Sequence, residues 1–194
     1  MNSLIYKVHQ NYIEFIAYPF KCSSVYKNRR LDASDIVDAT ENFWPDLIRT
    51  TDDELIIIGY RQEEKGEHKK LPRFYDENNI VLRKDVVNIW GHILEPFLDT
   101  EYSEDHLERD FQILEKHGIS RSECESVRKE VNDRMIAYNF TSCLWEWVNL
   151  DLYDVLKASI GVLSGEKYQL NDKDFEEFYY HAMNIGIKGF KQHD

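Results

Sequence analysis

The first third of the chain carries short runs of β-branched and aromatic residues, a pattern typical of β-strands. Leu4–Val8 and Tyr12–Tyr18 have this character and are separated by the turn residues Gln10 and Asn11, so they predict a β-hairpin. Val25–Leu31 predicts a third strand. The hairpin and this strand would form one antiparallel sheet.

A second hairpin is predicted further along the chain. Asp46–Thr50 and Glu54–Ile58 flank the turn residues Thr51–Asp53. The stretch Leu55–Ile58 is continuously apolar rather than alternating, which predicts a central strand buried on both faces. With the first three, these strands give an N-terminal antiparallel sheet of about five strands.

The segment Arg61–Lys70 is almost wholly charged and lacks apolar periodicity, as in an exposed connection. We place a boundary here, within about ten residues. The prediction is a β-rich domain over residues 1–70 and a helical domain over residues 71–194.

Beyond Val81 the apolar residues recur at the spacing of helices, beginning with one face made by Val86, Ile89, Trp90, Ile93, Leu94 and Phe97. The whole segment predicts about five to six helices. Because strands come first and helices follow without alternation, the fold class is α+β, with the helices covering one face of the sheet.

Polar residues mark where several of these helices begin. Ser103 before two acids, Ser120 with Glu123 three residues on, and Asn171 before Asp172 are helix N-caps. The pair Asn132–Asp133 predicts a break between two helices.

Composition and charge narrow the classes of function. The net charge of −12 disfavours nucleic acid and anionic lipid as partners and suits a basic protein partner. No apolar run approaches the roughly 18 residues of a membrane span, and the first residues do not read as a secretory signal. Three widely spaced cysteines are typical of free thiols, so we expect a cytoplasmic protein. The oligomeric state cannot be read from the sequence.

A basic cluster lies in the β-rich part. Lys21, Lys27 and Arg29 are close in sequence, and Lys27 and Arg29 share one face of the predicted third strand. Their spacing is similar to the basic loop of pleckstrin-homology domains, and the strands that follow resemble the middle of that barrel over about 60 residues. The resemblance implies a half-barrel that binds phosphate or a lipid headgroup at these three residues. The alternative is an edge strand that its charges protect from aggregation.

Possible metal ligands or acid–base groups occur in the helical part. His92 and Glu95 lie three residues apart on one predicted helix and are therefore neighbours. The spacing is His-x-x-Glu rather than the Glu-x-x-His of di-metal bundles, and no HExxH motif is present. A small metal-dependent enzyme that uses these residues remains an alternative hypothesis.

An aromatic segment gives the strongest indication of a binding surface. Trp145 and Trp147 are separated by about 200° around a helix, so both cannot face one core. Together with Tyr153 they are candidates for contact with a partner, because Trp and Tyr supply large contact areas. The alternative is a helix packed between two layers of the fold.

The sequence lacks the motifs of the common catalytic classes. There is no Gly-x-Ser-x-Gly frame, no glycine-rich phosphate loop and no Cys-x-x-Cys pair. We therefore expect no cofactor and no catalytic residue. The hypothesis that fits best is a non-enzymatic protein-binding or regulatory module.

Overall fold

A computed structural model describes residues 4–40, 45–59, 65–98, 103–142 and 149–190. The fold is α+β, as predicted, and it divides into two compact units, Met1–Val86 and Val87–Asp194. The second unit begins after the segment 71–86, which the charge pattern had assigned to the helical part. The reason is that this segment contains a strand that pairs within the first unit.

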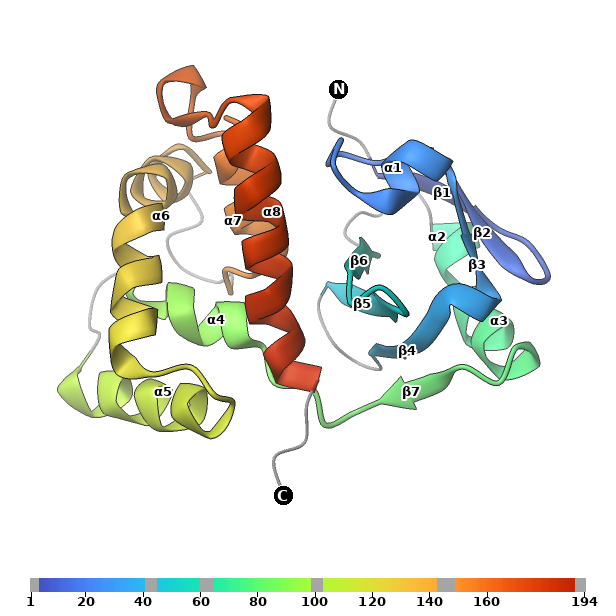
Figure 1. The fold of residues 1–194 in the computed structure, drawn as a ribbon, viewed down its shortest axis with the longest axis horizontal. Helices are drawn as coiled ribbons and strands as arrows, with labels where there is room; N and C mark the ends of the chain where they lie inside the picture. The colour runs from blue at the N-terminus through green and yellow to red at the C-terminus, as the bar shows by residue number, and fades with distance from the viewer. Residues whose placement is uncertain (1–3, 41–44, 60–64, 99–102, 143–148, 191–194) are drawn as a thin grey trace. The chain divides into compact units, whose positions relative to one another are not determined.

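The first unit contains two sheets in place of the predicted single sheet (Figure 1). One has the order β1-β2-β3 and the other the order β6-β5-β4-β7, and in the described residues neither closes into a barrel, so the pleckstrin-like half-barrel is not formed. All pairs are antiparallel except β4 with β7. The elements are β1 (Ile5–Val8), β2 (Tyr12–Ala17), α1 (Ser24–Asn28), β3 (Arg30–Asp32), η1 (Ala33–Asp35), β4 (Ile36–Thr40), β5 (Asp46–Thr50), β6 (Leu55–Ile58), α2 (Lys65–His68), α3 (Leu71–Glu77) and β7 (Val81–Arg83).

Strand β6 is fully buried, as its apolar run predicts, but it lies at the edge of its sheet and not at the centre. The hydroxyl of Tyr18 lies at this edge and accepts a hydrogen bond from the backbone N–H of Ile57 at 3.0 Å. An edge strand normally presents unpaired backbone groups to other chains. Here a side chain satisfies one of them inside the core.

The core of the first unit also contains a buried charge. The carboxylate of Asp38 on β4 is 3% exposed and accepts two hydrogen bonds from the guanidinium of Arg49 on β5, at 2.9 and 2.6 Å. Arg83 on β7 lies 3.6 Å from the same carboxylate. A buried carboxylate is unfavourable unless charged or hydrogen-bonding groups surround it. Here these groups come from the two neighbouring strands, so the contacts join β5, β4 and β7.

In its described residues, the second unit has five α-helices with short 3₁₀ turns (Figure 1). Its elements are α4 (Ile89–Leu94), η3 (Glu95–Phe97), α5 (Glu104–Lys116), α6 (Arg121–Ser142), α7 (Leu152–Ser159), η4 (Glu166–Tyr168), α8 (Asp172–Ile187) and η5 (Lys188–Phe190). Helix α4 contacts α5, α6 and α8. Its Trp90 is 1% exposed and donates its indole N–H to the carbonyl of Ala182 at 3.0 Å, which links α4 to α8 inside the core.

The predicted caps are confirmed, whereas the predicted break in α6 is wrong. Ser103, Ser120 and Asn171 each accept a hydrogen bond from the backbone three residues on. Helix α6 continues through Asn132–Asp133, whose side chains hydrogen bond with each other at 2.9 Å on the outer side. The helix persists because its opposite side is buried throughout, and packing outweighs the weak helix propensity of these two residues.

Candidate functional site

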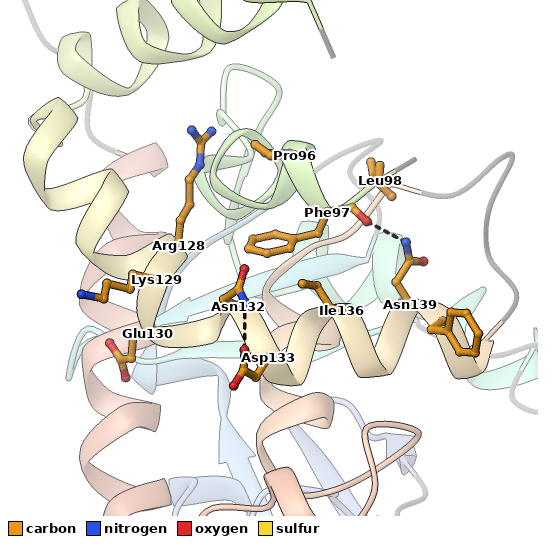
Figure 2. A pocket seen from close by; sticks show the side chains of 11 residues that line it. Pro96, Phe97, Leu98, Arg128, Lys129, Glu130, Asn132, Asp133, Ile136 and Asn139 are labelled. Atoms are coloured by element: carbon orange, nitrogen blue, oxygen red, sulfur yellow. Dashed lines mark hydrogen bonds between the residues drawn. The ribbon is translucent and has the colours of Figure 1, made fainter. Parts of the chain in front are cut away.

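The candidate site is a groove on the second unit, between helix α6 and the η3 turn (Figure 2). Its volume is about 940 Å³. Two apolar side chains one helical turn apart open onto it, Ile136 at 54% exposure and Phe140 at 68%. Phe140 is the most exposed large apolar side chain among the described residues. Clustered apolar exposure of this kind is a mark of interaction sites.

The other wall of the groove is formed by Pro96, Phe97 and Leu98. In Figure 2 the ring of Phe97 faces α6 beside Asn132 and Ile136. Pro96 occupies the first turn of η3, where its missing N–H leaves no donor unsatisfied. The groove therefore has apolar side chains on both walls.

Two polar side chains of α6 fix the position of the opposite wall. Asn139 donates its amide N–H to the carbonyl of Phe97 at 2.6 Å, seen as a dashed line in Figure 2. Arg128 donates to the carbonyls of His92 and Ile93 at the end of α4, at 3.0 and 2.9 Å. These carbonyls lie in the last turn of α4. These hydrogen bonds fix η3 and the end of α4 against α6, and so set the spacing of the two walls.

Charged side chains stand at one end of the groove, where Figure 2 shows Lys129 and Glu130. Glu130 also lines a second, smaller hollow of about 310 Å³ between α6 and α8. That hollow contains the carboxylates of Asp174 and Glu177 and the imidazole of His181. The apolar groove and the acidic hollow thus share one residue.

The predicted metal ligands His92 and Glu95 lie at the end of α4. His92 Nδ1 is 2.9 Å from a carboxylate oxygen of Asp110 on α5, so this imidazole links two helices. Burial, and then the charge of Asp110, raises the pKa of Glu95 above its usual range. Among the described residues, no three His, Cys, Asp or Glu side chains are placed to hold a metal ion together.

The predicted phosphate-binding residues do not share the face of a strand. Residues 24–28 form helix α1 in place of the predicted strand, with Lys27 in its last turn and Arg29 at its C-cap with φ 58°. Arg29 donates to the carbonyl of Ile16 at 2.9 Å and lies 5.0 Å from the ring centre of Tyr26. Lys21 is exposed. Phosphate binding at these residues stays a prediction.

Of the three aromatic residues predicted to bind a partner, Trp145 and Trp147 lie outside the described residues. Tyr153 is 4% exposed and packs in the core of the second unit, with the ammonium of Lys157 5.4 Å from its ring centre. Its ring is therefore part of the interior. The two tryptophans stay a prediction.

Sequence reasoning missed Ile136 and Phe140, although a signal for them exists. Val131, Met135 and Tyr138 define the buried side of α6, and Ile136 and Phe140 fall on the opposite side at a spacing of four residues. Two apolar residues at that spacing, away from the buried stripe, indicate a second apolar surface.

Neither protein-family models nor curated proteins nor solved structures give a match to this chain. In the part of the chain that the structure describes, no helix combines the length and apolar character that crossing a membrane requires.

Proposed function

We propose that this chain is a non-enzymatic protein-binding module that receives apolar side chains of a partner in the groove between η3 and α6. The observation that carries the proposal is the exposure of Ile136 and Phe140 on a groove whose far wall is also apolar. Covering a large apolar side chain stabilises a complex by roughly 1.5–3 kcal/mol. Two adjacent anchors of this kind are typical of the centre of a protein interface.

The shape of the groove favours a helical segment as the bound element. One wall is the exposed side of α6, on which the apolar pair is followed toward the N-terminus by Asp133 and Lys129. An amphipathic helix can lay an apolar stripe against such a wall, with anchors at the same spacing of three or four residues. A polar rim around apolar anchors excludes water from the contact.

The test compares partner capture by the full chain and by two variants. Ile136→Ser with Phe140→Ser removes both anchors, whereas Val81→Ser removes an equally exposed apolar residue (57%) from the first unit. We expect the double variant to lose at least 90% of a partner that the unaltered chain and Val81→Ser both retain. Thermal unfolding of all three proteins is measured first, and we expect it to be unchanged because the altered side chains are exposed.

Equal capture of the same partner by the double variant would contradict the proposal. Failure of the unaltered chain to retain any protein specifically would count against it as well. Once a partner is purified, its dissociation constant should rise at least tenfold for the double variant, which corresponds to about 1.4 kcal/mol.

A further inference from the structure

Building on the proposed function, we infer that the partner segment is a basic amphipathic helix whose Lys or Arg side chain enters the acidic hollow next to the apolar groove. Three carboxylates line this hollow, those of Glu130, Asp174 and Glu177. Glu130 also lines the groove, so the groove and the hollow adjoin at this residue.

Two cations near the hollow, Lys173 and Arg134, offset part of the charge of its three carboxylates. Lys173 lies 3.7 Å from Glu177, but both side chains are more than 70% exposed, and exposed pairs of this kind are weak. Arg134 lies 3.7 Å from Glu130 and is itself buried, with its guanidinium 4.7 Å from the ring centre of Phe178. The guanidinium of Arg134 stays protonated, so it offsets part of the charge of Glu130. Asp174 accepts a hydrogen bond from Asn171 at 2.7 Å, which leaves its charge in place.

The wider surface carries the same sign. Residues 87–194 contain 21 acidic and 11 basic side chains, so most of the chain's net charge belongs to this unit. A field of this sign attracts cationic segments and repels anionic ones before contact. The cations Arg128 and Lys129 also line the groove, beside Glu130 and Asp133, so the excess of negative charge lies in the hollow and not in the groove itself.

The geometry also predicts where the basic residue lies in the partner. Glu130 precedes Ile136 by six residues and Phe140 by ten on one helix, which corresponds to about 9–15 Å along its axis. A partner helix lying along α6 therefore needs its Lys or Arg about two to three turns from its apolar anchors. The bound segment is then defined by two features, an apolar pair and a cation at this separation.

Three synthetic helical peptides test the inference by fluorescence anisotropy. The first has leucines four residues apart and a lysine two turns away. The second has glutamate in place of that lysine, and the third has serines in place of the leucines. We expect the lysine peptide to bind at least tenfold more tightly than either of the others, and more weakly as salt is raised.

Charge variants of the full chain identify the hollow as the place where the lysine binds. Glu130→Gln with Glu177→Gln should weaken binding of the lysine peptide about fivefold to tenfold. The control, Glu166→Gln with Asp172→Asn, removes two exposed acids that do not line the hollow. It should leave binding of the lysine peptide unchanged. Phe140→Ser should abolish binding of this peptide.

The possible failures are distinguishable. Equal binding of the lysine and glutamate peptides, both lost in Phe140→Ser, overturns the basic partner and leaves the proposed function standing. No binding by any peptide, or binding that survives Phe140→Ser, overturns the inference, while the capture experiment still judges the groove. A dimer in sedimentation that Phe140→Ser dissociates overturns it in favour of a second copy of this chain.

Discussion

Asp151 and Asp154 cap the N-terminus of α7 reciprocally, each accepting a hydrogen bond from the other's backbone N–H. Asp154 Oδ2 accepts from the N–H of Asp151 at 3.0 Å, and Asp151 Oδ1 accepts from the N–H of Asp154 at 3.3 Å. Both carboxyl groups are buried, and Tyr138 on α6 donates its hydroxyl to Asp154 at 2.8 Å. Burial, and then the charge of Asp154, raises the pKa of Asp151 well above its usual range.

This raised pKa predicts how stability depends on pH. The folded state holds the proton of Asp151 more tightly than the unfolded state does. The resulting stabilisation is therefore complete below the ordinary carboxyl pKa and is lost as pH rises through the folded-state pKa. Asp151→Asn keeps an oxygen that can cap the helix and removes the charge. We expect it to raise the free energy of unfolding at alkaline pH by on the order of 1 kcal/mol.

Urea unfolding at a series of pH values checks this prediction. The variant should lose less stability than the unaltered protein between acidic and alkaline pH. The matched control is Asp172→Asn, because Asp172 is an exposed acid in the first turn of α8. This variant should lose as much stability between acidic and alkaline pH as the unaltered protein does. If Asp151→Asn keeps the pH dependence of the unaltered protein, the pair Asp151 and Asp154 does not govern how stability changes with pH.

Tyr18→Phe tests the hydroxyl that accepts a hydrogen bond at the edge of β6. Loss of the hydroxyl leaves the N–H of Ile57 buried without its acceptor, so we expect the free energy of unfolding to fall by about 1–3 kcal/mol. Hydrogen exchange at the Ile57 amide should also accelerate. Tyr26→Phe removes a hydroxyl from a half-exposed ring and should change neither quantity. Equal exchange rates at Ile57 in the two variants would refute the role assigned to Tyr18.

Two glycine substitutions should have opposite effects. A Cβ at Gly189 would lie 2.1 Å from the backbone oxygen of Val87, so Gly189→Ala must displace main chain and should destabilise the protein by about 1–3 kcal/mol or more. A Cβ at Gly66 meets nothing within 4 Å, and this position is helical. Gly66→Ala should therefore raise the free energy of unfolding by up to about 1 kcal/mol. Thermal unfolding compares the two variants. An unchanged unfolding temperature for Gly189→Ala would contradict the close approach of Gly189 to the backbone oxygen of Val87.

Local signals in the sequence predicted the local features of this fold. The caps at Ser103, Ser120 and Asn171 were predictable because each depends on a side chain and a backbone group three residues apart. Strand β7 was missed because its pairing with β4 joins segments distant in sequence. The break expected at Asn132–Asp133 failed for a related reason, since burial of the opposite side of α6 holds the helix together.

The candidate site was less predictable than the fold. Exposure of Ile136 and Phe140 depends on which side of α6 the other helices cover, and the sequence alone does not state this. The wall that contains Phe97 lies more than 30 residues earlier and is attached by Asn139 and Arg128 through backbone carbonyls. Carbonyls are present in every residue, so no pattern of residue types marks them as partners.

The hydrogen bond from the N–H of Val87 to the carbonyl of Gly189, at 3.1 Å, brings together the beginning and the last described turn of the helical unit. The polypeptide thus enters this unit and reaches the end of its described part at the same place. A module with adjacent ends can be inserted into a surface loop of a host protein without distorting the module or the host. It is equally suited to circular permutation, with a short linker across these ends and new termini opened elsewhere.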